Sequence, residues 1–393
     1  MLIDDIKECS KCGICRAACP VFLIVNNETA SPRGRVSLVE AMLEGKLSIS
    51  DRYIDTIRAC IKCTRCADVC PSGVRPEKIV QSAREMLFDA VGAPEEIKEA
   101  LRLTLRPKQF REHLINKYDR GKSENDIPLC QLPLMFHGNA YLPNLAEKIV
   151  LESYPEYINA YGKRKVALFV GCSVNYSYTS IADSVIDVLK KLGVSVFIPK
   201  DQLCCGAPLL FYGDVEGTKA LAKINLDVLK YDDFDAVLTL CPACGITLKQ
   251  DYERLLGVSD FTSKIYDVSE YIAKFCDYNS QKTNMSVTYH DPCYLRLGQK
   301  VSAEPRRILR DISQYIEMKN ADKCCGLGGT LWLFHPEISQ KIGESKVKSI
   351  INSGADIVAT GCPGCMLFIK DMLKKNGINR EVLHTIQVLQ KTL

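Results

Sequence analysis

Two copies of one cysteine spacing constrain this chain more than any other feature of its sequence. Each copy places four cysteines within eleven residues in the order Cys-x2-Cys-x2-Cys-x3-Cys-Pro. The first copy holds Cys9, Cys12, Cys15 and Cys19, and the second holds Cys60, Cys63, Cys66 and Cys70. Four thiols this close in sequence predict a bound metal centre for each copy.

The proline after each fourth cysteine indicates how the eight thiols are shared. Three thiolates spaced two residues apart can surround one 4Fe-4S cube from a short loop, while the fourth turns toward a second cube, as in bacterial ferredoxins. We therefore expect two cubane clusters with crossed ligation. The expected sets are Cys9, Cys12 and Cys15 with Cys70, and Cys60, Cys63 and Cys66 with Cys19. Paired zinc sites are the alternative, but zinc signatures separate two Cys-x2-Cys pairs by a longer arm.

The number of cysteines and the start of the chain bear on the redox compartment. The chain has 20 cysteines in 393 residues and begins MLIDD, with acid where an export signal carries base. We therefore expect a cytoplasmic protein whose reduced thiols bind metal, and any contact with the inner face of a membrane would pass through a partner. A net charge of +4 disfavours nucleic-acid binding. The longest apolar runs, such as 166–170, are too short for a helix that crosses a bilayer.

A second cysteine pattern occurs twice and accounts for ten more thiols. It consists of one cysteine, then a Cys-Cys-Gly triplet, then a Cys-Pro-x-Cys pair. The copies are Cys172, Cys204, Cys205, Cys241 and Cys244, followed by Cys293, Cys324, Cys325, Cys362 and Cys365. Equivalent cysteines lie 120 or 121 residues apart, and such a constant offset indicates a duplicated module.

Each module alternates short apolar runs with helix-periodic segments, which predicts parallel sheets with right-handed crossovers. The expected strands are 166–170, 194–198, 236–240, 286–290, 315–318 and 357–360, and the expected helices are 181–192, 215–230 and 306–312. The cysteines then follow the carboxyl ends of strands, where open α/β sheets bind their ligands. Five thiolates exceed the four ligands of tetrahedral zinc, so we expect a polynuclear iron–sulfur centre in one or both modules, with zinc in one module as the alternative.

These patterns predict an α+β multidomain chain, in which a helical two-cluster ferredoxin domain precedes two duplicated α/β modules with parallel sheets. The expected units are the ferredoxin domain at 1–90, a helical or irregular connector at 91–162, and the modules at 163–280 and 281–393. Periodic apolar residues predict helices at 35–46, 51–59 and 76–89, and in the connector at 95–105 and 108–118.

Cys-Cys-Gly with an upstream cysteine and a downstream Cys-x2-Cys, twice, after two ferredoxin runs, resembles the cysteine-rich-domain family of redox subunits. This family includes the iron–sulfur subunit of glycolate oxidase, related subunits of anaerobic glycerol-3-phosphate and lactate dehydrogenases, and the D subunit of heterodisulfide reductase. Residues 30–35 and 70–75 are similar to the glycolate-oxidase branch. The complete sets of five cysteines resemble heterodisulfide reductases, so the resemblance implies one noncubane 4Fe-4S centre in each module.

The sequence lacks a convincing glycine-rich phosphate loop that opens a helix after a strand, so we expect no flavin of its own. The main hypothesis is an oxidoreductase subunit that passes electrons between a flavin-containing 2-hydroxyacid dehydrogenase and a quinone or another carrier, directly or through a membrane electron-transfer subunit. One alternative is a reductase that splits a thiol disulfide at noncubane centres, and another is a zinc-stabilised scaffold.

Five residues near the cysteines have two interpretations each. His290 either donates a proton at the second module's centre or makes a structural hydrogen bond in the ligand loop. Lys11, Arg16, Lys62 and Arg65 are either solvated charges, or they tune cluster potentials and contact an acidic partner.

Overall fold

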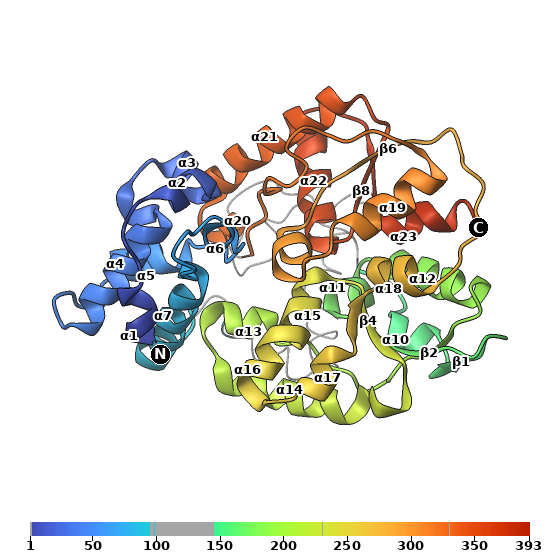
Figure 1. Ribbon diagram of the computed structural model, residues 1–393, viewed down its shortest axis with the longest axis horizontal. Coiled ribbons are helices and arrows are strands. Elements are labelled where there is room, and N and C mark those ends of the chain that lie inside the picture. Colours follow the sequence, from blue (N-terminus) through green and yellow to red (C-terminus); the bar gives the residue numbers. More distant parts are fainter. Residues whose placement is uncertain (1, 95–97, 99–144, 230, 330) are drawn as a thin grey trace.

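The computed structural model describes residues 2–94, 98, 145–229, 231–329 and 331–393. An N-terminal helical domain lies against two α/β modules that face each other (Figure 1). Its elements are α1 (Leu2–Lys7), α2 (Ile14–Ala18), α3 (Pro20–Val25), η1 (Glu28–Ala30), α4 (Pro32–Leu43), α5 (Asp51–Arg58), α6 (Arg65–Asp68) and α7 (Pro76–Val91). The helices expected at 95–105 and 108–118 lie outside the described residues, as does Cys130.

The helical domain has a core of its own, in which α4 packs on α7. Val36, Val39, Ile57, Ile79 and Ala83 are all fully buried there. Proline stands in the first turn of both helices, where its fixed φ suits the helix start and its missing N–H costs no hydrogen bond. The three helices expected in this domain are therefore present, within about three residues of their expected ends.

The first module is built on a five-stranded sheet in the order β1-β3-β2-β4-β5. The strands are β1 (Tyr157–Ile158), β2 (Lys165–Phe169), β3 (Ser195–Phe197), β4 (Ala236–Thr239) and β5 (Ile265–Asp267). The expectation of a wholly parallel sheet is wrong at one edge, because β1 pairs antiparallel with β3. A two-residue strand gives no readable alternation of apolar and polar residues, so its direction depends on tertiary contacts.

The second module has a parallel four-stranded sheet in the order β7-β6-β8-β9. Its strands are β6 (Ser286–Tyr289), β7 (Gln314–Tyr315), β8 (Ile357–Thr360) and β9 (Glu381–His384). The sequence interpretation missed β5 and β9, which are equivalent final strands without a following cysteine. Both sheets nevertheless place the expected cysteines just beyond their strands, in agreement with the predicted fold class.

Helices cover both sheets and also join the two modules. In the first module they are α10 (Val150–Ser153), α11 (Cys172–Tyr176), α12 (Thr179–Lys191), α13 (Ala207–Tyr212), α14 (Val215–Leu229), α15 (Pro242–Ile246), α16 (Tyr252–Leu256), α17 (Ser259–Ser263) and α18 (Val268–Phe275). In the second they are α19 (Ala303–Ile312), α20 (Leu331–Phe334), α21 (Pro336–Ser353), α22 (Pro363–Lys375) and α23 (Thr385–Gln390). Short one-turn elements are η3 (Tyr231–Asp233), η4 (Thr247–Asp251) and η5 (Tyr294–Gly298).

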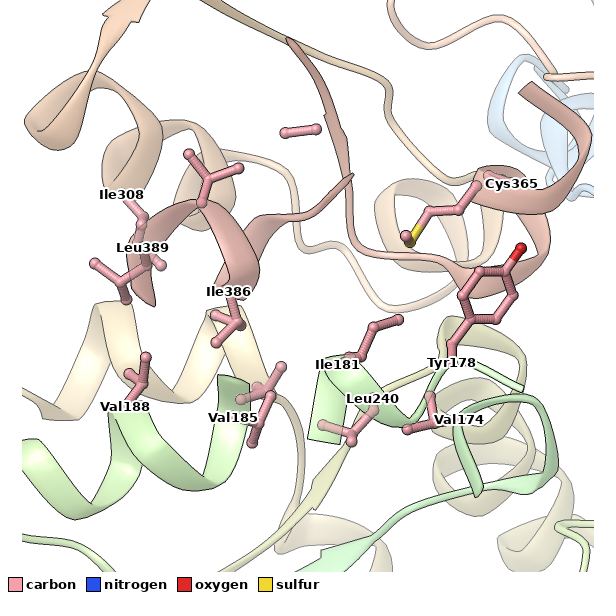
Figure 2. Packing of buried hydrophobic residues seen from close by; sticks show 14 of the residues in the cluster. Val174, Tyr178, Ile181, Val185, Val188, Leu240, Ile308, Cys365, Ile386 and Leu389 are labelled. Carbon is pink, nitrogen blue, oxygen red and sulfur yellow. The ribbon is translucent and has the colours of Figure 1, made fainter. Parts of the chain in front are cut away.

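The modules pack through equivalent helices in reciprocal fashion. Helix α12 of the first packs on α23 of the second, while α18 of the first packs on α19 of the second. Val185 and Val188 on α12 face Ile386 and Leu389 on α23 (Figure 2). One apolar core thus runs through both modules, as expected when each copy of a duplicated unit buries its free face against the other.

The helical domain contacts both modules, and α7 reaches the first of them at α13. At this contact the chain requires glycine at 213, where φ is +95° and an added Cβ would lie 2.1 Å from the Arg84 carbonyl oxygen. Helix α3 packs on α21 of the second module. Among the described helices, none combines the length and the apolar character needed to cross a bilayer.

Candidate metal centres

One cavity of the helical domain is lined by the first crossed set. Its cysteines are Cys9, Cys12, Cys15 and Cys70. Cys12 is exposed, so this site reaches the surface. Lys11 and Gly13 have φ of +56° and +88°, and Arg33 donates from Nη1 to the Lys11 carbonyl oxygen at 2.6 Å. Alternation of right- and left-handed residues turns backbone N–H groups inward and is typical of phosphate and iron–sulfur sites.

A second cavity is lined by the other crossed set. Its cysteines are Cys19, Cys60, Cys63 and Cys66. The loop repeats the backbone of the first, with φ of +54° at Lys62 and +62° at Thr64. Burial raises the pKa of Cys63 and Cys66 well above the usual value. Iron bound to these thiolates would offset the cost of ionising buried thiols, so the four cysteines fit a buried iron–sulfur cluster.

The second module brings two of its five cysteines to the side of this buried cavity. Cys293 and Cys324 belong to one apolar cluster with Cys19 and Cys63 of the helical domain. Burial raises the pKa of Cys63 most, and the charge of the Cys293 thiolate raises it next. Arg65 strengthens the contact, because its Nη2 lies 3.0 Å from Oδ2 of Asp322, just before the Cys-Cys-Gly triplet.

Within the second module the thiols lie in van der Waals contact. The Sγ atoms of Cys325 and Cys365 are 3.4 Å apart, and Cys362 accepts from the Cys365 backbone N–H at 3.4 Å. Hydrogen bonds from the Cys324 and Cys365 thiols hold the pKa of Cys325 well below its usual range. In the first module Cys205 likewise has hydrogen-bonded thiol neighbours in Cys204 and Cys244, and Cys205 and Cys244 are the buried members of that set. Gly206 and Gly326, which follow the paired cysteines, have φ of +91° and +117°, a region that glycine adopts without strain.

The two five-cysteine sets meet at the boundary between the modules. Cys241 and Cys362, the equivalent first cysteines of the two Cys-Pro-x-Cys pairs, are hydrogen-bonded side-chain neighbours. Gln299 of the second module also donates to the Pro242 carbonyl oxygen at 3.1 Å. The described thiols thus form one series, from the surface cavity through the buried cavity and the second module to the first. All 19 described cysteines are free of disulfides.

His290 is buried at the end of β6 and faces the second set. A ring nitrogen of His290 and the sulfurs of Cys325 and Cys365 lie within 4.8 Å of one another. Its Nδ1 lies 3.2 Å from the Ala321 carbonyl oxygen and must carry the proton, since a carbonyl only accepts. Burial, with help from Lys346, lowers the pKa of His290. This geometry contains the structural hydrogen bond expected of the loop, and the role in proton donation stays a prediction.

The four basic residues near the ferredoxin cysteines divide into two pairs. Lys11 and Arg16 are exposed or half-exposed and pair with Glu40 and Glu28. Their interpretation as solvated charges agrees with the structure. The same interpretation as a solvated charge is wrong for Lys62, which donates to Gln81, and for Arg65, whose side chain is 15% exposed.

Sequence reasoning missed three residues near the thiols. Arg84 on α7 and Lys346 on α21 are buried, and Tyr294 after Cys293 is half-buried. Arg84 and Tyr294 carry no local pattern that marks them. Lys346 was detectable, because alignment of the two modules by their cysteines places a lysine where the first copy has Asn225.

A buried carboxyl at the module boundary predicts a pH-dependent stability. Asp267 caps α18 by accepting from the Ser269 N–H at 2.8 Å, and burial raises its pKa to about 7. Since the unfolded carboxyl ionises near 3.9, the free energy of unfolding should fall by about 2–3 kcal/mol from pH 5 to pH 8. Asp267→Asn keeps a capping oxygen and should remove this decline in urea unfolding curves. An unchanged decline in the variant would contradict this role.

Comparison with known proteins places these observations in a family. The cysteine-rich domain matches residues 166–249 and 287–370, and the 4Fe-4S dicluster domain matches residues 5–74. An uncharacterized iron–sulfur protein of Methanococcus maripaludis is 33% identical, over 100% of this chain and 74% of its own. The probable glycolate oxidase iron–sulfur subunit of Bacillus subtilis is 30% identical, over 96% and 91% of the two chains. The D subunit of dihydromethanophenazine:CoB–CoM heterodisulfide reductase from Methanosarcina mazei is 27% identical, over 97% and 93%.

These matches confirm the predicted order of one ferredoxin-type domain and two duplicated modules, and they support iron–sulfur clusters as cofactors. They also confirm the resemblance drawn from the cysteine patterns, including its two branches. The chain therefore belongs to the cysteine-rich-domain family of iron–sulfur oxidoreductase subunits.

Proposed function

We propose that the chain relays electrons through a series of iron–sulfur clusters held by its eighteen patterned cysteines. Two cubane clusters would use the crossed sets at 1–90, and one further centre, of noncubane type, would use each set of five at 163–280 and 281–393. When bound, such clusters accept and donate single electrons. The observation that carries the proposal is the contiguity of the four sets. Pro76 lines both ferredoxin cavities, Cys63 lies beside Cys293, and Cys241 lies beside Cys362.

The residues of the chain give this series a direction from surface to interior. Cys12 opens the first cavity to solvent, whereas Cys63 and Cys66 close the second cavity from it. Arg65 and Asp322 hold the second module against the buried cavity. The first module lies farthest along the series and meets the second at Cys241 and Cys362. Electrons would therefore enter or leave at the exposed site and at the first module.

For the partners, we propose a flavin-containing 2-hydroxyacid dehydrogenase on one side and a quinone-linked or other carrier on the other, in the cytoplasm or at the inner face of a membrane through a partner. The relative from Bacillus subtilis, with its glycolate oxidase name, supports the dehydrogenase. The sequence offers no convincing phosphate-binding loop for a flavin, which assigns hydride chemistry to the partner.

A second candidate function is reduction of a disulfide at the boundary between the modules. The supporting observation is that Cys241 and Cys362 bring two complete five-cysteine sets together there. A disulfide bound at this boundary would need two electrons, one from each side, and two protons. The relative from Methanosarcina mazei carries a heterodisulfide reductase name, which supports this candidate.

The test is anaerobic purification of the full chain, followed by iron and sulfide analysis, EPR and stopped-flow reoxidation. We expect cubane signals together with at least one signal of another type. Reduced protein should be reoxidised by a quinone analogue, and the chain alone should not oxidise glycolate or lactate with a dye. Reoxidation by a disulfide and not by the quinone would favour the second candidate. Protein without iron and sulfide would overturn both.

A further inference from the structure

The two modules differ in charge at one equivalent buried position. Helices α14 and α21 are equivalent, because Thr218 and Ser339 each donate a hydroxyl hydrogen bond to the carbonyl oxygen of the glycine in the Cys-Cys-Gly triplet. Two turns along each helix, seven residues later, the first module has Asn225 and the second has Lys346. Both side chains point back to the loop that carries the paired cysteines.

In the second module, the residue at this buried helix position is the cation Lys346. Lys346 is 2% exposed, and its Nζ donates to the carbonyl oxygens of Asn320 at 2.8 Å and Ala321 at 3.1 Å. Burial lowers the pKa of Lys346 to about 8, and the Cys325 and Cys324 thiolates act in the opposite direction. The ammonium group therefore stays charged at neutral pH and acts on the sulfurs through protein rather than through water.

In the first module, Asn225 supports the corresponding loop without charge, at residues closer to the paired cysteines. Its Nδ2 donates to the Cys204 carbonyl oxygen at 3.0 Å, and its Oδ1 accepts from the Leu203 N–H at 2.8 Å. The Tyr252 hydroxyl lies 3.0 Å from the same Nδ2. The loop of the first module is thus supported by a neutral amide, whereas the loop of the second module is supported by a charged group.

We propose that Lys346 sets the reduction potential of the second module's centre above that of the first module's centre. Reduction adds one electron, and so one negative charge, to a centre without making or breaking a bond. Lys346 shares the Ala321 carbonyl oxygen with His290, and a ring nitrogen of His290 lies within 4.8 Å of the Cys325 and Cys365 sulfurs. A buried cation at this place stabilises the reduced form of the centre more than the oxidised form. An electron arriving from the buried cavity beside Cys63 would then rest at the second module, and the first module would be reduced only as electrons accumulate.

The test rests on the proposed function, because it needs both module centres loaded. EPR-monitored redox titration of the full chain should give two midpoint potentials for these centres, at least 59 mV apart, which is a tenfold partition for one electron. Lys346→Asn, which installs the first module's residue, should lower the upper midpoint and shift the partition at least tenfold. Lys348→Asn removes an exposed lysine from the same helix and should leave both midpoints in place. Lys346→Arg retains the charge and should keep the order.

The outcomes separate the two proposals. Purified chain without iron, or without EPR signals from the centres of the two modules, would refute the proposed electron relay. Loaded centres with equal midpoints in the unmodified chain would overturn the role of Lys346 without any variant. So would a shift confined to the lower midpoint, or equal shifts in Lys346→Asn and Lys348→Asn. If Lys346→Asn does not fold, Lys346→Gln, whose longer amide can reach the same carbonyls, replaces it.

Discussion

Replacement of Cys19 by alanine should remove the buried cubane cluster and leave the exposed one in place. Cys19 belongs by sequence to the first cysteine run, but it lines the cavity of Cys60, Cys63 and Cys66. Without Cys19 the buried site keeps only three of its four thiolates, because the neighbouring Cys293 and Cys324 belong to the set of the second module. The iron content should fall by about four atoms per chain. Iron and sulfide analysis together with EPR of the remaining cubane measures this loss.

The reciprocal variant makes the prediction specific. Cys70→Ala should remove the exposed cluster and spare the buried one, because Cys70 lines the cavity of the first run. Cys276→Ala removes a half-buried thiol outside both cavities and should leave iron content unchanged. Because Cys19 lies toward the second module, its variant should also stop electron transfer from the exposed cluster to the modules. If Cys19→Ala instead removed the exposed cluster, ligation would not be crossed.

Replacement of Arg84 by methionine should lower the free energy of unfolding by about 2–5 kcal/mol, because each buried carbonyl left without a donor costs about 1–3 kcal/mol. The guanidinium is 1% exposed and donates to the carbonyl oxygens of Ile57, Arg58 and Phe211 at 3.2, 2.8 and 3.2 Å. It also lies 4.5 Å from the centre of the Phe211 ring. Methionine fills much of the volume but removes the guanidinium donor from the Arg58 and Phe211 carbonyl oxygens, whereas the Ile57 oxygen also accepts from the Cys60 N–H at 3.4 Å.

The matched control for this prediction is Arg52→Met, which removes an exposed arginine of the same domain. Thermal unfolding at equal iron content should show a decrease of several degrees for Arg84→Met and little change for Arg52→Met. Since Phe211 belongs to the first module, limited proteolysis should also release the helical domain sooner from the Arg84 variant. Equal unfolding of both variants would mean that Arg84 does not join the domains.

Much of this protein could be predicted from its cysteines. The spacing of two residues places three thiols of a run on one loop, and the offset of 120 or 121 residues reveals the duplication. Apolar runs of four or five residues next to helix-periodic segments predicted β2, β4, β6 and β8, because strands buried on both faces carry no polar alternation. The short strands β1, β5 and β9 lacked such runs and were missed.

The sequence by itself determined which residues can bind clusters, how many sets there are, and that two of the sets are copies. Only the tertiary structure decided that the second module, not the first, lies beside the buried ferredoxin cavity at Cys63 and Cys293, and that Cys241 meets Cys362. The same holds for the burial of Arg84 and Lys346. The physical reason is that ligand spacing is local, whereas neighbours across domains and the environment of a charge depend on how apolar faces pack together far apart in the chain.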